Sequence, residues 1–302
     1  MGASRPAVGF AIPFAVCCAG VALFAVMDAA MKGLSLAIGL YNALFWRAVA
    51  GTLLGLALML LTRQRWPSRA VLRIHLLRGT VVALMAGLFF WAIMRMPLAE
   101  AIALSFIAPL IALYLAALLL KERVGRRAIG ASLLGLVGVG VILSGRLQGQ
   151  YDADALLGAG AVLASAVLFA WNLIIQRQQA QLASPIEVAF FQHLVMLGVF
   201  VLGAPFLLVL PPLPSVPLVL LAASLAFTSL AALSWAYARA EAQRLIPVEY
   251  SAFVWAAIIG WLVFGERITL PTVAGALLII VACLIAVRAK RPELAHVEAG
   301  TA

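Results

Sequence analysis

Runs of about twenty apolar residues follow one another along almost the whole chain and constrain its fold more than any other feature. A helix needs roughly 20 such residues to cross the hydrocarbon core of a bilayer. Ten runs match or approach this length, namely 9–28, 41–62, 76–94, 101–120, 128–144, 156–175, 187–209, 217–237, 247–264 and 271–288. We therefore expect an all-α, polytopic membrane protein with ten transmembrane helices.

The composition indicates the same class of protein. Hydrophobic residues make up 66% of the 302 residues and charged residues only 11%, whereas soluble domains contain about 45–50% and about 25%. A soluble core could not bury this much apolar surface, so lipid must be the solvent for most of the chain. We expect one membrane domain over 1–302. The three cysteines, Cys17, Cys18 and Cys283, suggest small core residues rather than a disulfide framework.

Two stretches 144 residues apart share one pattern. In each, two apolar spans flank a short polar hinge, Lys121-Glu122-Arg123 in the first and Gly265-Glu266-Arg267 in the second. A polar connector, 145–155, lies between the fifth and sixth spans. Because self-similarity at a fixed offset indicates a structural repeat, we interpret the chain as two five-helix repeats, 9–144 and 156–288.

Lysine and arginine set the expected orientation, because cytoplasmic loops carry an excess of these residues. With the N-terminus in the cytoplasm, sixteen lie on the cytoplasmic side, one (Arg47) lies inside a span, and four lie on the opposite side, namely Lys32, Arg95, Arg146 and Arg267. We expect a multi-pass protein of the bacterial inner membrane with both termini cytoplasmic. The net charge of +10 then reflects topology and contact with anionic lipid head groups, and no nucleic-acid partner is needed.

An odd number of spans per repeat requires the second repeat to enter the membrane from the opposite side. The charge of the two hinges agrees with this arrangement. Residues 121–127 carry four basic side chains on the expected cytoplasmic side, whereas 265–269 carry one on the other side. Inverted repeats of this kind are frequent in secondary transporters, whose substrates bind near the midplane between the repeats.

Four stretches carry a resemblance to a known family. They are Phe45-Trp46-Arg47, the run from Pro97 to Ala101 followed by Pro109, and the two hinges. Together they resemble the drug/metabolite transporter superfamily, in particular its ten-helix EamA-type branch. The resemblance implies a secondary exporter of amino acids or similar small metabolites, working by alternating access around a midplane cavity. Carriers of S-adenosylmethionine, riboflavin or drugs are similar too and stay open as alternatives. Many members have a proline in the ninth span where this chain has Phe253, so the two repeats differ chemically at that depth.

Pro109 falls in the middle of the fourth expected span. Proline removes a backbone donor and frees the carbonyl near Ser105, which bends the helix. One interpretation is a kink that serves packing alone. The other is a flexible half-helix that lines the cavity and gates transport, with Ser105 as a candidate substrate-binding residue.

Arg47 lies six residues past the start of the second span, roughly 9 Å into the membrane at 1.5 Å per residue. A charge at that depth is costly and usually faces the protein interior or water. Two interpretations compete. Arg47 is either a structural residue that reaches outward and pairs with Asp28 or Glu100, or a cavity residue that attracts a carboxylate-bearing substrate.

Aromatic side chains give the other candidates for the cavity. The family resemblance implies that the third, eighth and ninth spans surround it, which makes Phe90, Trp91, Tyr237, Tyr250 and Trp255 candidate substrate-binding residues. Tryptophan and tyrosine near span ends also occur as interfacial belts, and this alternative applies to Trp91 and Tyr237. A cavity walled by aromatic residues with few charges suits small amphiphilic solutes.

Several small residues of the fifth span allow close helix approach: Gly130, Ala131, Gly135, Gly138 and Gly140. They suit either a homodimer contact or packing within one chain. The sequence contains no metalloprotease, nucleophile-elbow or nucleotide-binding signature. We therefore expect no catalytic residue, no metal and no cofactor, and we regard a channel or an intramembrane enzyme as the less favoured class.

Overall fold

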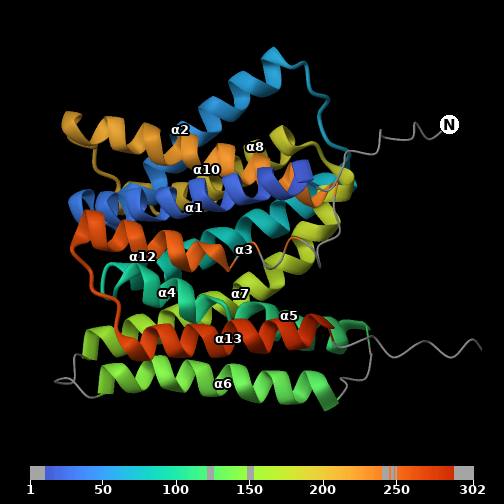
Figure 1. Cartoon of the computed structure of the whole chain (residues 1–302). Helices are drawn as coiled ribbons and strands as arrows, with labels where there is room; N and C mark the ends of the chain where they lie inside the picture. The colour runs from blue at the N-terminus through green and yellow to red at the C-terminus, as the bar shows by residue number, and fades with distance from the viewer. Residues whose placement is uncertain are drawn as a thin grey trace, which may run out of the picture.

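The chain folds into a bundle of α-helices that run roughly along one common direction (Figure 1). The computed structural model describes residues 11–120, 126–147, 153–239, 245, 248 and 250–288, and no strand occurs among them. The helices are α1 (Ala11–Ile38), α2 (Leu40–Leu61), α3 (Arg69–Ile93), α4 (Leu98–Ser105), α5 (Ala108–Leu120), α6 (Arg126–Leu147), α7 (Ala153–Leu182), α8 (Pro185–Val201), α9 (Ala204–Leu207), α10 (Val216–Tyr237), α12 (Ser251–Phe264) and α13 (Leu270–Arg288), with a 3-10 turn η1 (Leu213–Ser215) before α10.

Five helical segments of the described residues are long and apolar enough to cross a membrane: Ala11–Ile38, Leu40–Leu61, Arg69–Ile93, Ala153–Leu182 and Leu213–Tyr237. Five shorter apolar segments accompany them: Leu98–Ala112, Ile129–Ser144, Pro185–Val201, Ser251–Phe264 and Leu270–Ala282. Large apolar side chains such as Leu133, Leu202 and Trp261 are exposed on the outer surface, where lipid would cover them. The all-α membrane class is thus confirmed, and the count of ten spans stays a prediction.

The fourth expected span, 101–120, is divided into α4 and α5 at Phe106 and Ile107, where Pro109 is expected to bend the helix. The amide groups of these two residues donate to carbonyls only three positions earlier, at 3.2 Å, which is the tighter 3-10 pattern. Pro109 is the second residue of α5 and has no N–H to offer the carbonyl of Ser105. The proline therefore ends one helix and begins the next.

Helix α1 extends ten residues beyond the expected span 9–28 and ends at Ile38. Lys32, expected in a loop, is instead inside this helix and only 6% exposed. Asp28 lies one turn before it and is also buried. Since residues four apart share one helix face, α1 presents two opposite charges to the interior of the bundle.

Some of the small residues of the fifth expected span allow two helices of the same chain to pack closely. Helices α6 and α13 lie side by side at the lower edge of Figure 1. A Cβ atom on Gly275 would lie 2.5 Å from the carbonyl oxygen of Gly138, so these two backbones meet directly. Gly130 and Gly140 have open space at the same test position. A homodimer stays a prediction.

The second hinge is a helix C-terminus with an inward-turned carboxylate. Gly265 adopts φ 65° and ends α12, a left-handed conformation that favours glycine. Its N–H donates to the carbonyl of Trp261, and the N–H of Glu266 donates to the carbonyl of Gly260, both at 3.1 Å. The backbone thereby turns so that the side chain of Glu266 enters the bundle.

Candidate functional site

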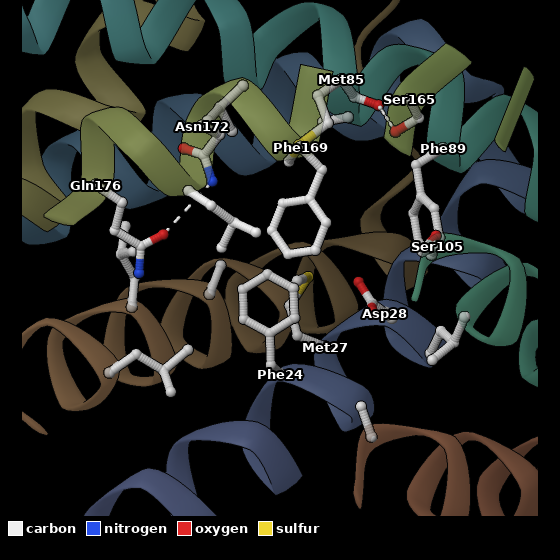
Figure 2. A pocket seen from close by; sticks show the side chains of 18 of the residues that line it. Phe24, Met27, Asp28, Met85, Phe89, Ser105, Ser165, Phe169, Asn172 and Gln176 are labelled. Carbon is white, nitrogen blue, oxygen red and sulfur yellow. Dashed lines mark hydrogen bonds between the residues drawn. The ribbon is translucent and has the colours of Figure 1, made fainter. Parts of the chain in front are cut away.

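A cavity of about 240 Å³ lies between α1, α2, α3, α7, α8, α10 and the residues at the break between α4 and α5. Most of its wall is apolar, and Figure 2 shows Phe24 of α1 and Phe169 of α7 facing each other across it. Polar side chains are set into this wall, and they include Asp28, Arg47, Arg78, Ser105, Ser165, Asn172, Gln176, Gln192 and His193. An apolar cavity with a few polar groups is the usual form of a small-molecule site.

Asp28 and Arg47 bring opposite charges to this cavity. They are 5% and 6% exposed, respectively, and both line the cavity. The ion pairs within 4.0 Å among the described residues, however, are Lys32–Glu266 and His75–Glu187. Asp28 and Arg47 therefore face the same space without closing into a salt bridge.

The hydrogen-bonding groups of Arg47 are poorly matched by the protein. Nη1 contacts the Sδ atom of Met27 at 3.7 Å, and Nε has no hydrogen-bond partner in the described part of the chain. The guanidinium carbon lies 5.5 Å from the ring centre of Phe90, within the range of a cation–π contact. The Nε2 atom of Gln192, which also lines the cavity, likewise has no partner among the described residues.

Arg78 is a contrasting guanidinium in the same wall, because the protein satisfies it. Its Nε donates to Asn172 at 2.9 Å, Nη1 to Gln179 at 2.5 Å and Nη2 to Gln176 at 3.4 Å. The network continues from Gln179 to His75 at 2.6 Å, and from His75 to Glu187 at 3.0 Å. Arg78 thus ties α3 to α7, and His75 extends the link to α8, near the end of the bundle where α1 begins.

A buried ion pair lies at the other end of the bundle, beyond the cavity. Lys32 of α1 donates to Glu266 in the hinge between α12 and α13, and also to the carbonyl of Met96 at 2.9 Å. The other oxygen of Glu266 accepts the N–H of Leu98, the first residue of α4, at 2.9 Å. We call Lys32, Glu266 and these two backbone groups the latch. It joins α1, α4 and the α12–α13 hinge, which meet at the left of Figure 1.

A second contact at this end joins α4 to α13. The hydroxyl of Thr272 donates to Glu100 at 3.2 Å. Glu100 is 5% exposed and Thr272 is 1% exposed. The cavity residues of α1 begin one turn away from Lys32 and continue toward the start of that helix. The cavity therefore extends from the middle of the bundle away from the latch.

Five of the eight residues expected at the site line this cavity: Arg47, Phe90, Ser105, Tyr250 and the expected gating residue Pro109. The hydroxyl of Ser105 donates to the carbonyl of Ala101 at 2.9 Å. The ring of Tyr250 packs edge-on against Phe106, with ring centres 5.0 Å apart. Their roles in binding or gating stay predictions.

The other three expected residues, Trp91, Tyr237 and Trp255, are not part of the cavity wall. Trp91 lies under the guanidinium of Arg95, 3.6 Å from its ring centre, near the end of α3. Tyr237 is the last residue of α10 and packs on the cluster around Cys17 and Val21. Trp255 is 40% exposed and faces outward, because in α12 the residues that face α1 and α4 occupy another side of the helix.

The positions of Asp28, Lys32 and Glu266 in the bundle do not follow from the sequence patterns. The sequence predicts Asp28 as a structural partner of Arg47 and Lys32 in a loop, whereas both are buried in α1. A signal was present, since charged residues within an apolar run are costly and usually functional. The partner of Lys32 lies 234 positions away, and no local pattern identifies it.

Comparisons with known proteins agree with this architecture. The family model described as the EamA-like transporter family matches residues 11–144 and again 156–288. A crystal structure of a protein with 19% sequence identity has a similar fold, with a TM-score of 0.59 and coverage of 92% of this chain and 98% of that one. At that identity the likeness supports the fold alone.

Named relatives are bacterial exporters. The chain is 29% identical over 272 residues to the pseudopaline exporter CntI of Pseudomonas aeruginosa strain UCBPP-PA14, and 30% identical over 275 residues to that of strain PAO1. Each alignment covers 89% of this chain and 93% of the relative. An uncharacterized transporter of Helicobacter pylori is 27% identical over 210 residues, covering 68% and 70%. The chain therefore belongs to the EamA-like transporter family and is a membrane transporter of the EamA type.

Proposed function

We propose that the protein exports amino acids or similar small metabolites across the bacterial inner membrane by alternating access. The observation that carries this proposal is a cavity of about 240 Å³ inside the bundle, with the latch at the end of the bundle beyond it. A carrier needs a binding site that one gate separates from one side of the membrane while the other side is accessible. In this proposal the latch is that gate.

The size and lining of the cavity favour a small solute. Pockets for drug-sized ligands span about 300–1,000 Å³, so this cavity falls just below that range. Its wall is mostly apolar and carries a few polar groups. These properties favour an amino acid or a similar metabolite over riboflavin, S-adenosylmethionine or a bulky drug, which stay as alternatives. The names of the two Pseudomonas relatives favour pseudopaline as a second candidate.

The proposed movement is a rocking of the third and fourth spans (α3, α4 and α5) with the eighth and ninth spans (α10 and α12) around the cavity. With both termini in the cytoplasm, the cavity extends toward the cytoplasm and the latch closes the periplasmic side. Export then requires the latch to open while the helices at the other end close. The break at Phe106 and Ile107 supplies a flexible point in the cavity wall, because two backbone groups there lack the regular helical bonds.

The energy source in this proposal is not nucleotide hydrolysis, because the sequence has no nucleotide-binding loop. Transport is secondary or facilitated. A channel would conduct without saturation, and an intramembrane enzyme would return altered substrate. A carrier differs from both, because it saturates and returns its substrate unaltered.

Counterflow in proteoliposomes tests the proposal. Purified protein is reconstituted into vesicles that are loaded with one unlabelled solute, and accumulation of the labelled form is followed. The panel is leucine, phenylalanine, methionine, pseudopaline, S-adenosylmethionine and riboflavin, with protein-free vesicles as the control. Saturable accumulation of at least one amino acid, recovered unmodified, is expected. Accumulation of riboflavin or S-adenosylmethionine alone would show that these solutes, and not amino acids, are the substrates. If no solute accumulated saturably, the proposal that the protein is a carrier would be refuted.

A further inference from the structure

The cavity contains one carboxylate and one guanidinium whose pairing capacity the protein leaves unused. Asp28 makes no hydrogen bond or ion pair within the described residues, although it is 5% exposed. Figure 2 shows its side chain among those that line the cavity. Arg47 is 6% exposed, with Nε unpartnered among those residues and only a sulfur contact at Nη1.

Leaving such groups unmatched is costly, which suggests that something else matches them. Buried charges are normally paired and hydrogen-bonded, because removing an ion from water costs several kcal/mol. The same bundle shows that it can provide partners, since Arg78 receives three amide oxygens and Lys32 receives a carboxylate and a carbonyl. Asp28 and Arg47 lack such partners in the described part of the chain, and both line the cavity.

A ligand with only one charge would leave the other side chain unmatched. An anion would satisfy the donors of Arg47 and bring a like charge near Asp28. A cation would satisfy Asp28 and bring a like charge near Arg47. A solute with both an ammonium and a carboxylate group satisfies both side chains at once, and discrimination between ligands is greatest when the wrong one leaves buried groups unpaired.

We propose that Asp28 and Arg47 form a paired recognition site for dipolar ions, in which Asp28 accepts the ammonium group and Arg47 binds the carboxylate of one solute. The unpartnered Nε2 of Gln192 provides a further donor at the cavity wall. The apolar rings of Phe24 and Phe169 face the remaining volume and suit an uncharged side chain. This inference rests on the proposed function and specifies which solutes the site accepts.

The site also lies next to the latch. Asp28 and Lys32 are four residues apart on α1, about 6 Å along the helix axis, and Lys32 holds Glu266. A bound ammonium group at Asp28 would place a positive charge one turn from that of Lys32. The recognition site and the latch are therefore neighbours on one helix.

The test compares binding of three forms of one solute: phenylalanine, N-acetylphenylalanine, which has only the carboxylate, and phenylalanine methyl ester, which has only the ammonium group. Competition with the counterflow of labelled phenylalanine measures affinity for wild-type protein. The ligand-induced shift of the melting temperature in detergent measures affinity for variants that no longer transport. Leucine and methionine, with the same two derivatives, repeat the comparison.

Wild-type protein should bind the amino acid about tenfold or more tightly than either derivative, because hydrogen bonds to charged groups contribute that much. Asp28→Asn should weaken binding of the amino acid about tenfold or more, and the N-acetyl form should bind more tightly because the like charge is gone. Arg47→Gln should weaken binding of the amino acid similarly, and the methyl ester should bind more tightly for the same reason. Arg95→Gln is the control, since Arg95 does not line the cavity and contacts Trp91 instead, so this change should not alter the preference among the three forms.

Two different results would overturn these conclusions separately. If wild-type protein exchanges an amino acid but binds its derivatives equally well, or if both variants lose all three forms in parallel, the recognition site is refuted and the carrier stands. If no amino acid exchanges with wild-type protein, the proposed function and this inference fail together. A preference of Asp28→Asn for the N-acetyl form and of Arg47→Gln for the methyl ester would separate a recognition role from a folding role.

Discussion

The ammonium group of Lys32 in α1 is bonded to the carboxylate of Glu266 in the hinge between α12 and α13, across 234 positions of sequence. The same carboxylate accepts the N–H of Leu98 at the start of α4. Lys32 and Glu266 have side chains that are 8% and 14% exposed, so water screens the pair little. One ion pair therefore fixes three separate segments at the end of the bundle beyond the cavity.

Removing either partner of this pair should leave an uncompensated buried charge. We expect Lys32→Gln or Glu266→Gln alone to reduce the free energy of unfolding by about 3 kcal/mol. The double variant should lose less than the sum of the two, with a coupling energy of about 1.5 kcal/mol or more. Thermal or denaturant unfolding of the four proteins in detergent measures this cycle. Additive effects would mean that the two side chains do not stabilise the closed end together.

Opening of the latch should also change transport. In the proposed mechanism, the Lys32→Gln/Glu266→Gln double variant keeps its fold but lacks the ion pair of the latch. Vesicles that contain it should leak substrate or show exchange that saturates less. Counterflow of the best substrate and passive efflux from loaded vesicles measure the two effects. Arg95→Gln is a suitable control, because Arg95 lies at the same end of the bundle but contacts Trp91 and not the latch. Unchanged exchange and efflux in the double variant would remove the latch from the gate.

Pro109→Ala should impair transport while leaving the protein folded. Alanine restores the N–H that can donate to the carbonyl of Ser105 and join α4 to α5 as one helix. The cavity wall would then lose its flexible point. We expect a reduction in counterflow of about tenfold, with a melting temperature equal to or above that of wild type. Pro185→Ala is the control, because Pro185 begins α8 at a helix start and does not line the cavity. Full activity of Pro109→Ala would show that the break serves packing alone.

Gly275→Ala should separate α6 from α13. Its new Cβ would lie 2.5 Å from both the carbonyl oxygen of Gly138 and a side-chain carbon of Ile142, and a backbone atom cannot move away without shifting a helix. We expect a loss of about 1–3 kcal/mol in unfolding free energy. Gly140→Ala lies on α6 with open space at the new Cβ, so it should be neutral or slightly stabilising. Equal stability of the two variants would contradict the close contact.

Some of this architecture could be predicted from the sequence and some could not, for identifiable physical reasons. Apolar run length predicts helices well, and the missing N–H of Pro109 predicts the break after Ser105. Run length does not predict where α1 ends. Asp28 and Lys32 interrupt the apolar run as loop residues would, and only the folded structure shows that both are buried inside the bundle. Trp255 was placed in the cavity because its depth in the span is right, but depth does not determine which side of a helix faces inward. Whether Asp28 and Arg47 form a salt bridge depends on how α1 and α2 place their side chains. The spacing of residues along the sequence does not determine this.

Reporter fusions should place the two ends of the bundle on opposite sides of the membrane. Lysine and arginine predict that the segment between α2 and α3 is cytoplasmic and that the segment between α8 and α10 is periplasmic. Alkaline phosphatase is active only in the periplasm, so a fusion after Leu210 should be active and one after Arg65 inactive. A fluorescent protein fused after Ala302 should mature in the cytoplasm. Activity after Arg65 with none after Leu210 would invert the orientation and turn the cavity toward the periplasm, whereas equal activity at both positions would mean that an odd number of spans does not separate them. The expected pattern would place the latch on the periplasmic side, where an exporter must close before it loads substrate from the cytoplasm.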